Sequence, residues 1–315
     1  MQPSAILRLV YATCGLVIAS PASAASPQLQ LPLVCTPSTD CWVPNYVDDD
    51  PSPMAKDYTG GVRTYDGHKG TDFAIPDKRI MAAGVVVTAS ASGKVLGVRD
   101  GMQDIEVDKI GHQAVQNREC GNGVVIDHGD GWHTQYCHMR QGSIGVKPGD
   151  VVATGAPLGL VGMSGDAAFP HVHLQLSHDD AIVDPFVEKL WAPPAAALLA
   201  YHASDVYLLG VSAAAPNQDG ARDGDYDDAK LTQPLDSFFL WADMFGVRPG
   251  DQLAMRIGGK FDKTAPIPVQ TPKARQFVAL RVSSGVWLKG EYRLAIDLLR
   301  GGRVVARNER AFVIE

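Results

Sequence analysis

The chain has 315 residues, of which 45% are hydrophobic, and this length is sufficient for two globular domains. It carries 28 Lys and Arg residues against 35 Asp and Glu residues, which gives a formal net charge of −7. The basic residues form no stripe that could follow a phosphate backbone, so the sequence argues against nucleic acid as a partner.

Residues 1–24 have the pattern of a secretory signal peptide. Arg8 precedes an apolar run from Leu9 to Ala19, and Ala22-Ser23-Ala24 supplies the small residues of a cleavage site. The run is too short for a comfortable membrane span, although a retained anchor is the alternative. We expect an exported protein, periplasmic or secreted, with no integral membrane span after cleavage.

Residues 25–60 are rich in Pro, Ser and Asp. We interpret them as an extended N-terminal arm that leads into a domain over residues 61–190. Within the arm, Asp48-Asp49-Asp50 is interpreted as a solvated acidic loop in preference to a calcium site.

The first candidate metal ligands are His68 and Asp72, four residues apart. Gly67, Gly70 and Pro76 argue against a helix in this segment. In an extended chain, side chains four positions apart point to the same side and can converge on one ion. Such a pair is common by chance, so it needs partners elsewhere in the chain.

Short apolar runs separated by glycine turns continue through this domain, at 84–88, 93–98, 121–126 and 151–153. None of these runs shows sustained helical periodicity. The domain is therefore expected to be mainly β, with antiparallel sheets.

Four cysteines remain after the predicted cleavage, and an even number in an exported chain indicates disulfides. Three pairings are formally possible. Cys35 and Cys41 enclose a short loop, and Cys120 and Cys137 lie near the bases of two strands that turn at Gly129–Gly131, so we favour these two pairs. A cysteine-rich metal site is disfavoured because the close C-x-x-C spacing is absent.

Two further strands carry histidines. In Pro170–Leu176 the apolar residues Val172, Leu174 and Leu176 alternate with His171, His173 and Gln175, so both histidines are expected on one polar face. The run Thr134–Met139 also alternates, and this pattern places His138 on the same face as Thr134 and Tyr136.

Two or three histidines with one carboxylate form the ligand set of a catalytic zinc site, in which an open position holds water. Zinc lowers the pKa of that water to about 7. Histidines that do not bind the metal could then remove a proton or stabilise an oxyanion. Taken singly, each histidine could equally be a surface or core residue, and the spacing alone does not decide which of His171 and His173 is a ligand.

Together these residues resemble the lysostaphin/LytM-type zinc endopeptidases, which cut peptide cross-links in bacterial cell walls. The resemblance covers roughly residues 60 to 187 and is carried by three ordered blocks: His68–Phe73; Gly121–Gly131 with Thr134–Met139; and Val146–Asp150 through Gly162–Gly165 to Pro170–His173.

The resemblance implies that His68, Asp72 and His173 bind Zn²⁺, that His138 and His171 assist catalysis, and that peptidoglycan peptides are the substrate. The chain departs from the family at Phe169, where a small residue is usual, and at an insertion over residues 100–119. Both departures are expected to alter the substrate groove. The other histidines of this domain are expected to be surface or packing residues, although His112 in the insertion is a candidate for substrate contact: His112, His128, His133 and His178.

Residues 191–200 are interpreted as a linker to a C-terminal domain over residues 201–315. Strands are expected at 236–245, 252–257, 275–282, 291–300 and 303–314, with a hairpin at Gly301-Gly302. This spacing predicts a small β-sandwich, immunoglobulin-like in outline, that contains no catalytic cluster. It could hold the enzyme near its polymer substrate or dock an unknown protein partner, and the sequence does not choose between these roles.

Residues 217–228 carry alternating carboxylates reminiscent of a calcium loop. They lack the closing bidentate glutamate, so a plain exposed loop is favoured over calcium binding.

The function expected from the sequence is that of an exported zinc metalloendopeptidase acting on peptidoglycan cross-links or stem peptides. The alternative from another class is a noncatalytic LytM-like module that binds cell wall or activates an amidase. A zinc endopeptidase acting on glycine-rich proteins would share the mechanism and differ in substrate.

Overall fold

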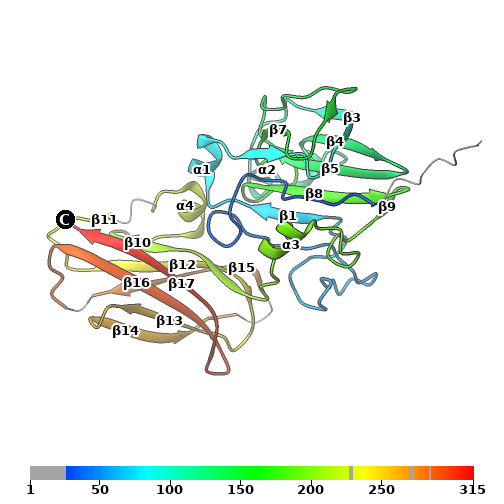
Figure 1. Ribbon diagram of the computed structural model, residues 1–315. Coiled ribbons are helices and arrows are strands. Elements are labelled where there is room, and N and C mark those ends of the chain that lie inside the picture. Colours follow the sequence, from blue (N-terminus) through cyan, green and yellow to red (C-terminus); the bar gives the residue numbers. More distant parts are fainter. Residues whose placement is uncertain (1–25, 227–229, 270–272, 284) are drawn as a thin grey trace, which may run out of the picture.

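The computed structural model describes residues 26–226, 230–269, 273–283 and 285–315. The predicted signal peptide therefore lies outside the described residues. Among those residues, no helix combines the length and the apolar character needed to cross a membrane. The chain folds into two β regions, one coloured blue to green and the other yellow to red (Figure 1).

The first region is built on a seven-stranded sheet in which every pairing is antiparallel, as predicted. Its spatial order is β1 (Thr71–Ala74), β8 (His171–His178), β5 (Trp132–Met139), β4 (Asn122–Gly129), β3 (Gly93–Arg99) and β6 (Val151–Val152), with β9 (Ala181–Ile182) paired to β8. A second small sheet pairs β2 (Val86–Thr88) with β7 (Pro157–Leu160).

Three short helical segments interrupt the strands, although the sequence shows no helical periodicity there. They are α1 (Lys78–Ala83), α2 (Val107–Ile110) and the 3₁₀ helix η1 (His112–Val115). Asp77 begins α1 by accepting a hydrogen bond from the backbone N–H of Ile80. Each of these segments is one or two turns long, which is too short for a helical repeat of apolar residues to be recognised in the sequence.

The N-terminal arm is part of the core of the first region. Leu29 and Leu33 are buried in it, and Trp42 and Tyr46 are buried further along the arm. Backbone hydrogen bonds attach the arm to the domain, for example from Trp42 N–H to Ala74 C=O at 3.0 Å. The arm is therefore positioned to reach the ends of β1 and β8.

The segment 191–200, interpreted from the sequence as a linker, contains helix α3 (Pro193–Leu198). Proline in the first turn and the alanines that follow favour a helix here. Trp191, Ala195 and Leu199 are buried in the core of the first region. The segment is therefore a packed part of that region.

The C-terminal region is a two-sheet sandwich, as predicted. One sheet has the order β10 (Asp205–Ser212), β12 (Phe238–Val247), β15 (Lys273–Val282), and the other has the order β11 (Lys230–Leu231), β17 (Arg303–Ile314), β16 (Gly290–Arg300), β13 (Gln252–Ile257), β14 (Phe261–Pro266). Residues from both sheets bury their side chains in one core. The predicted strands are present, whereas β10, β11 and β14 were not expected from the sequence.

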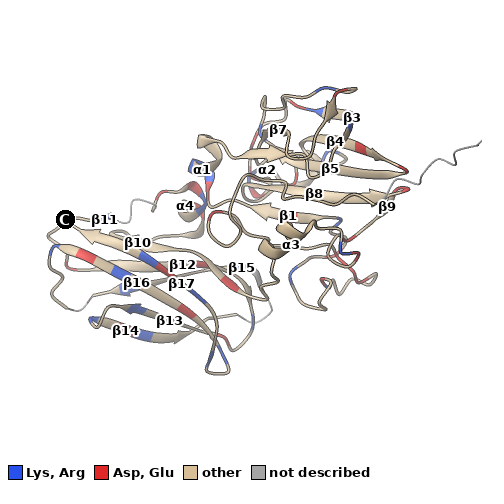
Figure 2. Ribbon diagram, viewed as in Figure 1, with Lys and Arg blue, Asp and Glu red and all other residues tan. Residues whose placement is uncertain are grey.

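The acidic segment 217–228 is partly helical, which corrects the expectation of a plain loop. Helix α4 (Gln218–Asp223) begins at Asn217, whose side chain accepts from Gly220 N–H at 2.8 Å. Asp223 pairs with Lys78 of α1 at 2.5 Å, and basic and acidic segments meet there (Figure 2). Residues 227–228 lie outside the described part of the chain.

A buried arginine joins the two regions. Arg63 donates hydrogen bonds to the carbonyls of Val43 and Pro44 in the arm and to His202 in the C-terminal region. Its guanidinium carbon lies 3.7 Å from the centroid of the Phe245 ring. The two regions therefore share buried polar and aromatic contacts.

Both predicted disulfides are present. Cys35 and Cys41 have Cα atoms 6.0 Å apart, and Cys120 and Cys137 have Cα atoms 4.7 Å apart. The second bond links the start of β4 to β5 one residue before His138, whose N–H donates to Cys120 C=O at 2.8 Å. It therefore braces the strand segment that carries His138.

Candidate metal centre

Strand β8 separates its side chains as the sequence predicts. Val172, Leu174 and Leu176 are each 1% exposed and belong to the core. His171 and His173 lie on the opposite face and line a pocket. Regular alternation along the strand is sufficient to place both imidazoles in this pocket.

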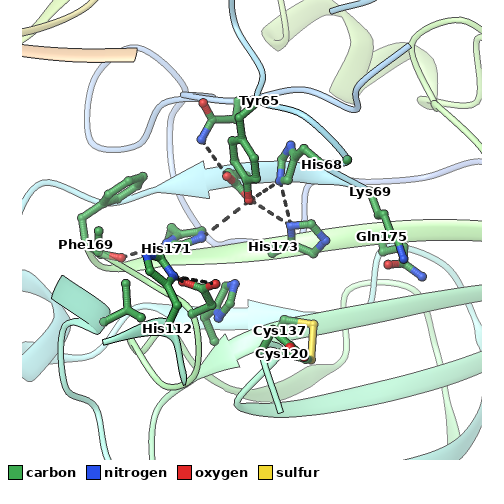
Figure 3. Close-up of a pocket in the computed structure, with 18 of the residues that line it drawn as sticks. Tyr65, His68, Lys69, His112, Cys120, Cys137, Phe169, His171, His173 and Gln175 are labelled. Atoms are coloured by element: carbon green, nitrogen blue, oxygen red, sulfur yellow. Dashed lines mark hydrogen bonds and ion pairs between the residues drawn. A yellow bond between two sulfur atoms is a disulfide. The ribbon is translucent and has the colours of Figure 1, made fainter. Parts of the chain in front are cut away.

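His68 and Asp72 meet His173 at one point. Asp72 on β1 lies directly across from His173 on β8, and His68 precedes β1 in a turn. Asp72 Oδ1 lies 3.2 Å from His68 Nε2 and 3.0 Å from His173 Nδ1, and the two imidazole nitrogens are 3.0 Å apart. Figure 3 shows His68 and His173 turned toward this common centre.

The outer atoms of these three side chains are held in place. Tyr46 C=O accepts from His68 Nδ1 at 2.6 Å, which leaves Nε2 as the lone-pair nitrogen. Asn45 Nδ2 donates to Asp72 Oδ2 at 2.9 Å, which leaves Oδ1 for the centre. A Cβ at position 70 would lie 2.6 Å from His173 Nε2, so Gly70 is needed for that ring to fit.

This arrangement suits a metal ion. One nitrogen or oxygen from each of His68, Asp72 and His173 lies within 4.8 Å of the other two. Two neutral imidazoles and a carboxylate are a ligand set of catalytic zinc, and hydrogen bonds to the outer ligand atoms are typical of such sites.

His138 reaches the pocket by a different route from the one expected. Simple alternation would put it with Tyr136, which is fully buried in the core. Instead β5 has a bulge, where Cys137 and His138 together face Gly123, and His138 has a left-handed φ of 61°. Cys137 lies on the pocket side by alternation with Gln135, and the bulge brings His138 to that side as well, so the predicted shared face with Thr134 and Tyr136 is wrong.

The two remaining imidazoles present the same nitrogen to the pocket. His138 Nδ1 donates to Ser164 C=O at 2.8 Å, and His171 Nδ1 donates to Phe169 C=O at 2.8 Å. In the neutral ring Nε2 is then the acceptor. His171 Nε2 lies 3.6 Å from Asp72 Oδ1, and the centroids of the His138 and His171 rings are 4.6 Å apart.

The electrostatics favour an ionised carboxylate at Asp72 and a neutral imidazole at His138. Burial raises the pKa of Asp72, but the imidazoles of His68 and His171 outweigh burial and hold it well below its usual value. Burial, reinforced by repulsion from His171 and His173, lowers the pKa of His138 well below its usual value. At neutral pH Asp72 is ionised and His138 can accept a proton.

The insertion forms one wall of the pocket. Val107, Asp108 and His112 line it, and His112 Nδ1 lies 2.9 Å from Oδ1 of Asp166, which also lines the pocket. Phe169 also lines the pocket. Phe169 and the insertion, which are the two departures from the family pattern, therefore both lie where they can shape this pocket.

Residues 66–185 match the family model of Peptidase family M23. These residues form an M23 peptidase domain. The chain is 34% identical over 109 residues to the Peptidoglycan DD-endopeptidase ShyA of Vibrio cholerae, covering 35% of this chain and 20% of that protein. It is 30% identical over 145 residues to the Peptidoglycan DD-endopeptidase ShyB of the same species, covering 46% of this chain and 28% of that protein.

A solved structure, a zinc containing peptidase from Vibrio cholerae, is 27% identical with a TM-score of 0.30, covering 45% of this chain and 38% of that one. The alignments span about a fifth and just over a quarter of the lengths of the two curated relatives. The M23 domain contains all five candidate site residues, and the C-terminal sandwich lies beyond it.

Asn45 and Tyr65 belong to the site of the M23 domain and were not expected from the sequence. Asn45 comes from the arm, and the Tyr65 ring lies 4.4 Å from that of His68 (Figure 3). Nothing in the local sequence around Asn45 indicates a ligand partner 27 positions later. Only the packing of the arm against β1 brings it to Asp72.

Replacing Asn45 with alanine is expected to weaken zinc binding about 10- to 100-fold, because Asp72 loses the hydrogen bond that orients it. Competition with a chromogenic chelator would measure the affinity. Gln28→Ala, at an exposed carboxamide in the same arm, is the control. Equal affinities in the two variants would show that Asn45 does not orient the carboxylate.

Proposed function

We propose that this protein is an exported zinc metalloendopeptidase that hydrolyses peptide bonds in peptidoglycan cross-links or stem peptides. The observation that carries the proposal is the meeting of His68, Asp72 and His173 within 4.8 Å, beside the imidazoles of His138 and His171. In this proposal the first three residues hold the metal, and the other two face the reacting groups.

Bound zinc would supply a Lewis acid and a water with a pKa of about 7. Asp72 contributes the negative charge that favours a divalent cation at this buried point. His138 and His171 each keep Nδ1 on a backbone carbonyl, so their Nε2 atoms can accept a proton from water and return it to the leaving amine. The pocket between the insertion and Phe169 would hold the peptide strand.

The substrate assignment is supported by the names of two similar proteins, both Peptidoglycan DD-endopeptidases. Two disulfides suit an oxidising compartment such as the periplasm or the exterior of the cell. Both observations are consistent with export to the place where peptidoglycan lies.

The test is to incubate the purified protein with muropeptides isolated from cell walls and to analyse the products by mass spectrometry. We expect cleavage that a chelator abolishes and added zinc restores. A parallel incubation with a glycine-rich peptide separates the two substrate classes. A protein that binds zinc and muropeptides but cleaves neither substrate would be a noncatalytic wall-binding module, and the proposal would be wrong.

A further inference from the structure

Phe169 makes two contacts with the imidazole of His171. Its carbonyl oxygen accepts the hydrogen bond from His171 Nδ1 at 2.8 Å, and its ring lies 4.7 Å from the imidazole centroid (Figure 3). The carbonyl selects the tautomer, and the ring limits how far the imidazole can tilt. The placement of Phe169 therefore sets the placement of His171 Nε2.

The Phe169 ring also contacts the C-terminal sandwich. The guanidinium carbon of Arg275, on strand β15, lies 4.8 Å from the centroid of the Phe169 ring and 4.9 Å from that of Tyr207. A guanidinium at this distance from an aromatic ring is in the range of cation–π attraction. The sandwich thus contacts the residue that holds His171.

Arg275 is itself fixed by a buried polar network. Its Nη2 donates to Asp243 Oδ2 at 2.6 Å, and the same oxygen accepts from the hydroxyl of Tyr207 at 2.6 Å. The Asp243 side chain is fully buried, and the Arg275 side chain is 11% exposed. A charge-assisted hydrogen bond in such surroundings leaves the guanidinium little freedom to leave the Phe169 ring.

We propose that Arg275 is a positioning residue for peptide hydrolysis, and that the C-terminal sandwich acts through Phe169 to fix His171 against the His68, Asp72 and His173 cluster. The proposal rests on the proposed function. It also gives a role to Phe169, which stands where the family usually has a small residue. A small side chain there would offer the guanidinium no aromatic face.

The first test compares kinetic constants of the zinc-loaded full chain on muropeptides. Arg275→Ala is expected to lower kcat by about 100-fold, as small displacements of a reacting group do, with KM and zinc content unchanged. Arg275→Lys keeps a charge for Asp243 but not the planar stack, so it should restore part of kcat. Arg281→Ala is the control, because this arginine lies on the same strand and contacts Ser237.

Coupling through Phe169 is tested by a double-mutant cycle. Phe169→Leu alone should lower kcat to a similar extent, and adding Arg275→Ala should cause little further loss, because both changes break the same contact. Strictly additive losses would overturn the proposal. So would a loss of kcat in Arg275→Ala that is accompanied by loss of zinc.

A readout independent of activity is the ¹⁵N NMR signature of the His171 imidazole. The wild-type chain and Arg281→Ala should show the Nδ1–H tautomer, whereas Arg275→Ala should show a mixture. If Arg275→Ala fails to fold, the same two measurements are made on Arg275→Lys and Phe169→Leu. A wild-type kcat together with the wild-type tautomer in both variants would overturn the proposal. A wild-type chain that cleaves nothing would refute the proposed function, while the NMR comparison would still test the Arg275 contact.

Discussion

Replacing Asp72 with asparagine is expected to reduce zinc affinity by more than about 100-fold and to abolish hydrolysis. The loss should exceed that for a residue that only orients a ligand, because in the proposed site Asp72 supplies both a ligand atom and the sole negative charge of the cluster. The amide keeps the shape of the side chain, so the fold should persist. Zinc per chain after dialysis, with product formation from muropeptides, measures the effect.

The pH dependence of zinc binding should change in the same variant. Burial opposes protonation of His68, but Asp72 outweighs it and raises the pKa of this imidazole above its ordinary value. Protons therefore compete with zinc as the pH falls through that raised pKa, and they should compete less in Asp72→Asn.

Asp130→Asn is the matched control for Asp72→Asn. Asp130 lies in the turn between β4 and β5 with a left-handed φ of 46°, which asparagine also adopts. This variant should bind one zinc and cleave as the wild type does. Full zinc occupancy in Asp72→Asn would show that the carboxylate is not a ligand.

The parts of the site that follow from local alternation could be predicted from the sequence. His171 and His173 share a face because β8 is regular. This strand has a repeating pattern that depends on burial of one face. The fold class and both disulfides were accessible from similar short-range signals.

The parts that depend on irregular backbone or distant packing could not be predicted. A bulge with one left-handed residue reverses the side on which His138 lies, and no periodic pattern reveals it. Asn45 reaches Asp72 only because the arm packs into the core. The sequence marked Phe169 as unusual, but its partner Arg275 lies in another domain, more than 100 positions later.

These irregular features share one physical consequence. The arm supplies Asn45 and the Tyr46 carbonyl, the loop before β8 supplies the Ser164 and Phe169 carbonyls, and each of these groups fixes the unreactive side of a site residue. The other nitrogen or oxygen atom of each side chain is then left to face the common centre. A site built in this way depends on segments that are far apart in the sequence.

Replacing His138 with asparagine is expected to lower kcat by about 10²- to 10⁴-fold, the usual contribution of a general acid or base, while zinc remains bound. Asparagine can keep a hydrogen bond to Ser164 C=O, but it cannot exchange a proton. Because burial and the neighbouring imidazoles lower the pKa of His138, the wild-type ring is a neutral acceptor at neutral pH. Steady-state kinetics and metal analysis of the same preparation measure both quantities.

His133→Ala is the control, because His133 lies on the same strand β5 but does not line the pocket. It should leave kcat and zinc content unchanged. The three-residue cluster proposed to hold the metal does not include His138, so loss of zinc in His138→Asn would assign it a ligand role instead. An unchanged kcat would assign the proton transfer to His171, whose Nδ1 is held by the Phe169 carbonyl and whose Nε2 lies 3.6 Å from Asp72 Oδ1.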